Sequence, residues 1–302
     1  MKINELSQKL ENRLRACTRP ETQRFYLETL KPVKNYLFKR NIYDIDDITY
    51  DDVIDLINIC HEIGLSNKTI NNKLEVIKKL INLNDITTAE QKQILQLKPL
   101  KHMPVAFMPL NKKDLFKFIK WVKELPVENH IRNLKKKCMF LLALQNGIRN
   151  TEMLEIKVRD LLMDTNRIKL SHTKNGEVRY AYFNDYTKEL LNKYIEQVKP
   201  RTYLFENRIT HERLNSNSYC DVFTNASNEL GIDVSSHILR ATFATRALRA
   251  GCNIESIRIM MGHTDLKTTQ MYLHMSDEEL LDDNQTYNPL AQYDKENNEN
   301  QN

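Results

Sequence analysis

A histidine and an arginine three residues apart could act together on a phosphate group. In the segment 237–240 (His-Ile-Leu-Arg), a helix would place the imidazole of His237 and the guanidinium of Arg240 on one face. The guanidinium is a permanently charged, planar fork of donors that suits negative oxygens, and the imidazole can move a proton near neutral pH. With 8 histidines and 17 arginines in 302 residues, about 0.45 such pairs are expected by chance. The pair alone therefore does not identify a site.

Further residues of the same chemical kind flank this pair in a fixed order. Downstream, Met-Gly-His at 261–263 is followed, after eight intervening residues, by Tyr272. Upstream, the segment 142–154 (Leu-Ala-Leu-Gln-Asn-Gly-Ile-Arg-Asn-Thr-Glu-Met-Leu) contains Arg149 and, three residues later, Glu152. Taken singly, each of these residues is more often a surface or core residue than a catalyst. Their joint occurrence in one order and spacing is what favours a site.

In this order the residues resemble the signature boxes of the tyrosine recombinases, the family of phage integrases and Xer-like proteins. The family pattern is Gly-Leu-Arg-x-x-Glu-Leu, then a lysine on a β-hairpin, then His-x-x-Arg, and finally Leu-Gly-His followed by Tyr. The chain departs from it at Ala241, where the family often has His, and at Met261, where Leu is usual. Gln145-Asn146 also makes the first box looser than average. Neither Ala241 nor Met261 replaces a group that the chemistry needs, and the motifs span about residues 105–275.

The resemblance implies a site-specific DNA recombinase, or integrase, that cleaves and rejoins DNA strands through a 3′-phosphotyrosyl intermediate. The residues at the family's catalytic positions are Arg149, Lys174, His237, Arg240, His263 and Tyr272. Displacement at phosphorus gathers negative charge on the non-bridging oxygens, which Arg149 and Arg240 would clamp. Tyr272 would be the nucleophile and would store the bond energy in a covalent phosphotyrosine.

The remaining residues of the set have supporting roles under the same interpretation. Lys174 would give the departing deoxyribose oxygen its proton, although Lys169 is a rival for this role. His237 would assist proton transfer at Tyr272, and His263 would hydrogen-bond the phosphate. Glu152 would orient the neighbouring histidines or arginines. No cofactor and no metal ion is expected, because the arginines supply the charge that Mg²⁺ supplies elsewhere, and the five cysteines form no Cys-x-x-Cys pair.

Composition and charge place these motifs in a globular, mostly helical protein with a polyanionic partner. Hydrophobic residues make up 41% and charged residues 28%, with only 6 glycines and 8 prolines, which argues against disordered and turn-rich β chains. The longest apolar run, 138–144, is far shorter than the ~20 residues of a membrane span, so we expect a soluble, cytoplasmic, nucleoid-associated protein without membrane contact. The net charges of residues 1–108, 109–276 and 277–302 are +3, +9 and −7. A basic body with an acidic tail suits nucleic acid. The candidate phosphate contacts are Lys73, Lys135, Lys136, Lys137, Arg246, Arg249, Arg258 and Lys267.

Helical patterning predicts a bundle over residues 1–98. Its helices are expected from the capping box at 18–21, from Thr49 with Asp52, from Ser66 to Ile81, and from 88 to 97. The helix from Ser66, which carries Asn71, Asn72 and Lys73, is the expected reader of bases. Three prolines within 99–109 indicate a linker.

The predicted catalytic domain covers residues 110–288, and a disordered acidic tail follows at 289–302. Period-two alternation on both sides of Asn175-Gly176 predicts a β-hairpin from 167–170 and 178–183. Helices are expected at 111–125, 127–146, 185–198, 216–230, 236–250, 254–261 and 266–274. The predicted fold class is therefore mainly α, with an N-terminal core-binding bundle and a mainly α catalytic domain that carries a small β-hairpin sheet.

The resemblance also implies how the protein would act with DNA. Both domains would grip a duplex with inverted half-sites, and a homotetramer would assemble on two DNA sites, with exchange of C-terminal segments between subunits. Two other functions stay open at this point: a non-catalytic DNA-binding protein of the same fold, and a type IB topoisomerase-like enzyme. The sequence also does not decide between two biological roles: chromosome dimer resolution, and the integration and excision of a mobile element.

Overall fold

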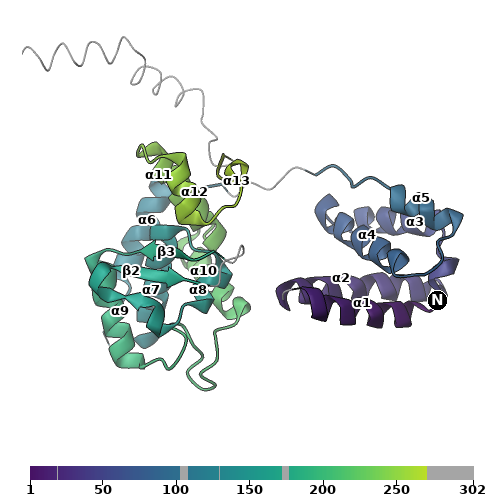
Figure 1. Ribbon diagram of the computed structural model, residues 1–302. Helices are drawn as coiled ribbons and strands as arrows, with labels where there is room; N and C mark the ends of the chain where they lie inside the picture. Colours follow the sequence, from purple (N-terminus) through teal and green to yellow (C-terminus); the bar gives the residue numbers. More distant parts are fainter. Residues whose placement is uncertain (19, 103–107, 129, 172–176, 271–302) are drawn as a thin grey trace, which may run out of the picture. The chain divides into compact units, whose positions relative to one another are not determined.

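The chain folds into two compact units, each built around its own hydrophobic core. The structure is a computed structural model that describes residues 1–18, 20–102, 108–128, 130–171 and 177–270. The units are Met1–Val105 and Ala106–Asn302, and Figure 1 shows their elements. Within the described ranges, none of the helices combines the length and the apolar character that a membrane crossing requires.

The first unit is a helical bundle, as the patterning predicts. Its elements are α1 (Ile3–Cys17), α2 (Pro20–Lys39), a 3₁₀ turn (Ile45–Asp47), α3 (Tyr50–Glu62), α4 (Asn67–Asn82) and α5 (Ala89–Gln96). The caps fix the starts of three helices: the side chains of Thr49, Ser66 and Thr88 accept backbone N–H groups of the first turns of α3, α4 and α5. These three predicted starts are confirmed.

Helix α1 is an element that the sequence pattern did not predict. It buries Ile3, Leu6, Leu10 and Leu14 in the bundle core, at helical spacing. Its N-cap residue, Lys2, makes no side-chain capping bond. The helix thus lacks the start signal that marks α3, α4 and α5, and packing against the bundle stabilises it instead.

The second unit surrounds a small antiparallel sheet with helices. Its helices are α6 (Lys112–Glu124), α7 (Ile131–Asn146), α8 (Asn150–Glu155), α9 (Asp185–Val198), α10 (Ser216–Leu230), α11 (Ser236–Arg249), α12 (Ile254–Met261) and α13 (Leu266–Gln270). Its 3₁₀ turns are Val158–Asp160 and Met163–Thr165, and its strands are β1 (Leu161–Leu162), β2 (Arg167–Leu170) and β3 (Arg179–Tyr182), in the order β1-β2-β3. The predicted hairpin is confirmed, with Arg167 opposite Tyr182 and Leu170 opposite Arg179. The short elements α8 and β1 had no periodic signal of their own.

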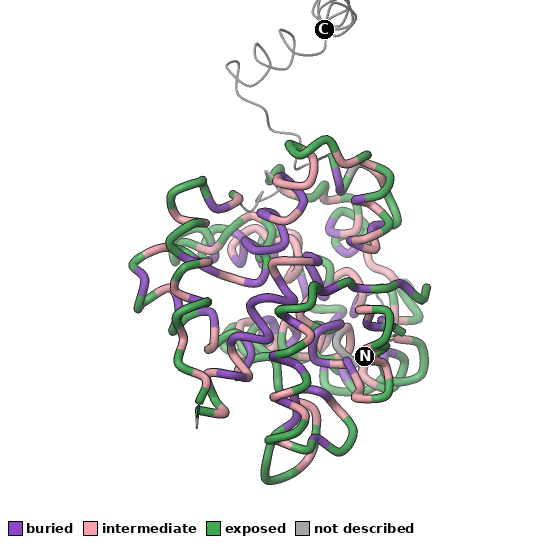
Figure 2. Tube along the Cα trace, turned by 90° about the vertical axis from the view of Figure 1, so that its left-hand side faces the viewer, coloured by how far each residue is buried: buried purple, intermediate pink, exposed green. Residues whose placement is uncertain are grey.

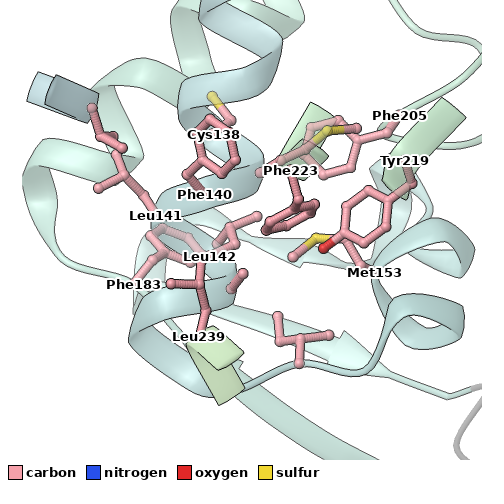
Figure 3. Close-up of a cluster of buried hydrophobic side chains, with 14 of the residues drawn as sticks. Cys138, Phe140, Leu141, Leu142, Met153, Phe183, Phe205, Tyr219, Phe223 and Leu239 are labelled. Atoms are coloured by element: carbon pink, nitrogen blue, oxygen red, sulfur yellow. The ribbon is translucent and has the colours of Figure 1, made fainter. Parts of the chain in front are cut away.

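Helix α7 runs through the core of the second unit, and its residues 137–143 are all buried. Figure 2 colours the buried segments of the chain purple. Phe140 of α7 packs edge-on against Phe223 of α10, with ring centroids 5.3 Å apart (Figure 3). The ring centroids of Tyr219 and Phe223 are 5.0 Å apart. The amide of Asn146, at the end of α7, exchanges hydrogen bonds with the backbone of Tyr182 in β3. These hydrogen bonds hold β3 next to the C-terminal end of α7, which lies within the first of the motifs described above.

Candidate active site

Two of the expected catalytic arginines, Arg149 and Arg240, converge on the C-terminal end of α12. Arg149 Nη2 donates to the carbonyl of Gly262 at 2.7 Å, and Arg240 Nη2 donates to the carbonyl of Met261 at 2.8 Å. The two guanidinium groups therefore bind consecutive peptide carbonyls, although their residues lie 91 positions apart in the chain. The fold brings together the first and second arginines as the sequence predicts.

Arg240 reaches this point because α11 packs directly on α7. The residue is only 5% exposed, and its Nη1 donates to the carbonyl of Gly147, the C-cap of α7. Gly147 has φ +56°, and a Cβ on it would stand 3.3 Å from Cγ of Arg240 and 3.1 Å from Cδ1 of Phe243. A glycine at this turn lets the arginine side chain pass close to the backbone.

Arg149 is held by the helix that it starts. It is the N-cap of α8, and Glu152, three residues later, accepts both the backbone N–H of Arg149 at 3.0 Å and its Nη1 at 3.0 Å. The side chain of Glu152 is buried, whereas that of Arg149 is 21% exposed. Glu152 thus orients an arginine, which is the role expected for it, and leaves the guanidinium of Arg149 partly accessible to solvent.

An unpredicted arginine, Arg179, shares the Glu152 carboxylate. Arg179 opens β3, is buried, and donates from Nη2 to Glu152 Oε2 at 2.5 Å and from Nη1 to the carbonyl of Met260. Burial opposes the charge on Glu152, but Arg179 and then Arg149 outweigh it, so the pKa of Glu152 is lowered. Glu152 is therefore a carboxylate at neutral pH, clamped between two arginines.

The end of α12 gathers four arginines on four successive carbonyls. Met260 accepts from Arg179, Met261 from Arg240, Gly262 from Arg149, and His263 from Arg258. The last carbonyls of a helix lack partners within the helix and carry its partial negative charge. Guanidinium groups bind the last two carbonyls of α12, those of Met260 and Met261, and the two carbonyls that follow the helix, which concentrates positive charge at one place.

His263 lies beside Arg240 as a neutral ring. Its Nε2 is 2.7 Å from Arg240 Nη2, and its Nδ1 is 2.8 Å from Thr269 Oγ1. Because an arginine can only donate, Nε2 accepts, and the ring proton sits on Nδ1. Burial first, and then Arg240, Arg149 and Arg179, lower the pKa of His263 to about 3. In this arrangement the ring accepts a hydrogen bond from Arg240, and its expected hydrogen bond to the phosphate stays a prediction.

This lowered pKa predicts that acid destabilises the second unit. In the unfolded chain a histidine takes up a proton near pH 6.5, whereas folded His263 does not. The contribution of His263 to the free energy of unfolding is therefore complete above pH 6.5 and decreases as the pH falls toward 3. Between pH 6.5 and 5.5 we expect a loss of about 1 kcal/mol that His263→Gln does not show. Urea unfolding followed by fluorescence of Trp121, the only tryptophan, measures this unit. His102→Gln, at an exposed residue of the first unit, should keep the wild-type loss, and an equal loss in all three proteins would refute the prediction.

His237 lies one helical turn before Arg240 at the exposed start of α11. Although the residue is exposed overall, protein packed around its ring, and then the charge of Arg240, lower its pKa. A lowered pKa keeps most of the imidazole neutral at physiological pH, which is the form that accepts a proton.

Gly262 leaves space for the arginine cluster, and a methyl group there should disturb it. The residue has φ +64°, and an added Cβ would lie 2.9 Å from Cδ and Nε of Arg179 and 3.2 Å from Arg149 Nη1. Gly231 also caps a helix, at φ +62°, but has no atom within 4 Å of such a Cβ. We expect Gly231→Ala to cost about 1 kcal/mol of stability from backbone strain alone and to react normally with DNA. Gly262→Ala should cost more stability than Gly231→Ala, and it should slow the DNA cleavage implied by the sequence resemblance at least about tenfold. Equal effects of the two substitutions in unfolding and cleavage assays would contradict this prediction.

The expected phosphate contacts differ in how the structure places them. Lys73 and Lys136 are half-buried, and so is Arg246, while Arg249 is exposed at the end of α11. Arg258 binds Glu255 and the carbonyl of His263, which makes it part of the cluster described above. Lys174, Tyr272 and the side chain of Lys267 lie outside the described residues.

Two members of the lysine run at 135–137 are not the surface lysines that the sequence suggested. Lys137 is buried, with its ammonium donating to the carbonyl of Lys123 at 2.6 Å, and Lys135 donates to the carbonyl of Glu206 at 3.1 Å. Burial lowers the pKa of Lys135. Because most of α7 is enclosed, these charges serve packing and do not support phosphate contact. In the first unit, Asn71, an expected base reader, instead exchanges hydrogen bonds with the backbone of Leu100.

Comparison with known proteins agrees with this assembly of residues. The family model "Phage integrase family" matches residues 109–279, and "Phage integrase, N-terminal SAM-like domain" matches residues 9–83. Tyrosine recombinase XerA of Saccharolobus solfataricus is 35% identical over 61% of this chain and 60% of its own length. Tyrosine recombinase XerC of Bacillus licheniformis is 25% identical over 88% of this chain and 90% of its own length.

Solved structures share the fold over nearly the whole chain. The Tn1549 transposon integrase, in complex with a circular intermediate DNA, superimposes with a TM-score of 0.71 at 18% identity, covering 94% of this chain and 98% of that one. A lambda integrase dimer bound to a core site gives a TM-score of 0.69 at 16% identity, covering 90% of this chain and 95% of that one. The integrase model matches more than half of the chain, and Arg149, Arg240 and His263 meet at one place in the fold. The chain therefore belongs to the phage integrase family, the tyrosine recombinases.

Proposed function

We propose that this protein is a site-specific DNA recombinase that cleaves and rejoins DNA through a 3′-phosphotyrosyl intermediate. The observation that carries the proposal is the pair of guanidinium groups of Arg149 and Arg240, held on consecutive carbonyls at the end of α12. A phosphodiester under attack gathers charge on its non-bridging oxygens, and preorganised arginines stabilise that charge without reorganising during the reaction. They supply the charge stabilisation that a metal ion supplies in other phosphoryl-transfer enzymes.

The remaining chemical roles follow the order of the boxes. Tyr272 attacks phosphorus, and His237, kept neutral by its surroundings, takes up the phenol proton. Lys174 protonates the departing 5′ oxygen. His263 accepts from Arg240, and a hydrogen bond of its own to the phosphate requires that a protonated ring nitrogen leave its present partner.

The proposed substrate is double-stranded DNA with inverted half-sites, on which four protomers assemble across two sites. The relatives support this partner: XerH recombinase is described bound to its difH substrate, and the Tn1549 integrase with transposon DNA. Residues 1–98 would act as the core-binding domain and 110–288 as the catalytic domain, with exchange of C-terminal segments joining subunits. The proposed phosphate contacts remain Lys73, Lys136, Arg246, Arg249 and Lys267. We place the protein with the nucleoid in the cytoplasm.

A nicked suicide substrate tests the function directly. Inverted half-sites are first selected by the protein from a random-sequence duplex pool, and a nick beside the cleavage position then lets a short fragment diffuse away after cleavage. A recombinase yields a covalent protein–DNA adduct on denaturing gels, and exchanges strands between two intact duplexes that carry the site. A binding protein yields a shifted complex but no adduct. A topoisomerase relaxes supercoiled plasmid that lacks the site.

A further inference from the structure

Arg179 makes contacts that the roles assigned above do not use. It is 7% exposed at the start of β3, and it joins two parts of the site that are distant in sequence. One nitrogen binds Glu152 Oε2 at 2.5 Å, and another donates to the carbonyl of Met260 near the end of α12. A single side chain therefore ties the carboxylate that orients Arg149 to the helix end that receives Arg149 Nη2.

The geometry points to Arg179 as a positioning residue for Arg149, an inference that rests on the proposed function. Arg149 donates to the other Glu152 oxygen, Oε1, at 3.0 Å and to the carbonyl of Gly262 at 2.7 Å. Arg179 thus binds Glu152, which is one acceptor of Arg149, and the carbonyl of Met260, two residues before the other acceptor, Gly262. Because Arg179 binds the carboxylate that also binds Arg149, it acts through Arg149.

The planar fork is essential to this role. Arg179 binds a carboxylate and a carbonyl at once: Nη2 and Nε donate to the two oxygens of Glu152, at 2.5 and 3.5 Å, and Nη1 donates to the carbonyl of Met260. A lysine ammonium keeps the charge but, as a compact group, does not reproduce this rigid spacing. Arg179→Lys should therefore restore only part of what Arg179→Met removes.

Single-turnover cleavage of the nicked substrate at saturating DNA tests the inference. We expect Arg179→Met to slow cleavage about 10- to 100-fold with DNA affinity within about twofold of wild type, since orienting partners typically contribute that much. In an Arg149→Lys background the same substitution should add less than about threefold, because two residues that act through one contact are not additive. A matched control is Arg167→Met at the start of the neighbouring strand, where Arg167 contacts Thr165 and the ring of Tyr180; its rate should stay within about twofold.

Several results would overturn the inference. Cleavage by Arg179→Met within twofold of wild type would do so, as would a full, independent loss in the Arg149→Lys background. If Arg179→Met fails to fold, the double variant Glu152→Gln, Arg179→Met removes both buried charges, and it should fold and still cleave slowly; wild-type cleavage by this variant overturns the inference.

A measurement without DNA separates this inference from the proposed function. In wild type, the hydrogen-bonded Arg149 guanidinium should rotate slowly and give distinct Nη signals by NMR, assigned by their loss in Arg149→Lys. Arg179→Met should merge these signals, and unchanged signals contradict the positioning role. Absence of any adduct with the wild-type protein refutes the proposed function and leaves the NMR result standing.

Discussion

Arg240→Lys is expected to slow formation of the covalent adduct about 100- to 1000-fold at saturating DNA. The guanidinium of Arg240 contacts Gly147, Met261 and His263 at once, at the junction of α7, α11 and α12. Lysine keeps one positive charge but cannot serve these acceptors and a phosphate oxygen in one plane. Loss of one preorganised donor to a developing oxyanion typically costs 10²–10³ in rate. Quenched-flow cleavage of the nicked substrate measures this loss.

The matched control for Arg240→Lys is the same change at Arg249, exposed near the end of the same helix. Arg249→Lys retains a charge near the surface, so cleavage at saturating DNA should stay within about threefold of wild type. DNA affinity of Arg240→Lys should fall far less than its cleavage rate. A rate for Arg240→Lys within tenfold of wild type would remove Arg240 from the phosphate clamp.

Tyr272→Phe is expected to abolish the adduct completely while leaving DNA binding intact. The phenol oxygen is the only atom lost, and in the proposed mechanism it forms the bond to phosphorus. Residual adduct above the limit of detection, about 10⁻⁴ of wild type, would mean that another nucleophile acts. The assay is the denaturing gel of the nicked substrate after a long incubation.

Tyr287→Phe and Tyr293→Phe serve as controls for this change, because both tyrosines follow Tyr272 in the same C-terminal stretch. Each control should give the wild-type yield of adduct. Loss of the adduct in either control, with retention in Tyr272→Phe, would transfer the nucleophile to that residue.

Local signals in the sequence predicted much of the fold, because those signals act over a few residues. Caps such as Thr49 with Asp52 and Ser66 satisfy the first N–H groups of a helix, so they mark its start. The Asn-Gly pair between two alternating runs located the hairpin. Helix α1 escaped detection because its N-cap, Lys2, provides no such bond.

The arginine cluster could be predicted only in part. The boxes locate Arg149, Glu152 and Arg240, since their spacing is local and specific. Arg179 was missed because alternation in β3 favours burial of its aromatic residues, whereas Tyr180 and Tyr182 are exposed and Arg179 faces inward. Its partners, Glu152 and the carbonyl of Met260, lie 27 and 81 residues away, so no local pattern reveals them.

For the run of lysines at 135–137, the sequence pattern predicted exposed side chains where the structure shows enclosed ones. A charged run usually marks a solvated helix face, yet two of these side chains end on the carbonyls of Lys123 and Glu206. A lysine can bury its apolar stem while its ammonium group reaches a polar partner, and here the partners are backbone carbonyls of other segments. The contacts in the folded chain are needed to distinguish lysines that bind backbone carbonyls from lysines that could bind a phosphate.

In the proposed mechanism, Tyr272 becomes joined to a 3′ phosphate at the arginine cluster. Digestion of the trapped adduct with nuclease and trypsin, followed by tandem mass spectrometry, locates the phosphodeoxyribose. The peptide 268–295 contains Tyr272, Tyr287 and Tyr293, so the fragment ions must assign the modified ring. The expected result is a 3′-linked nucleotide on Tyr272. A modification on either other tyrosine, or a 5′ linkage, would contradict it.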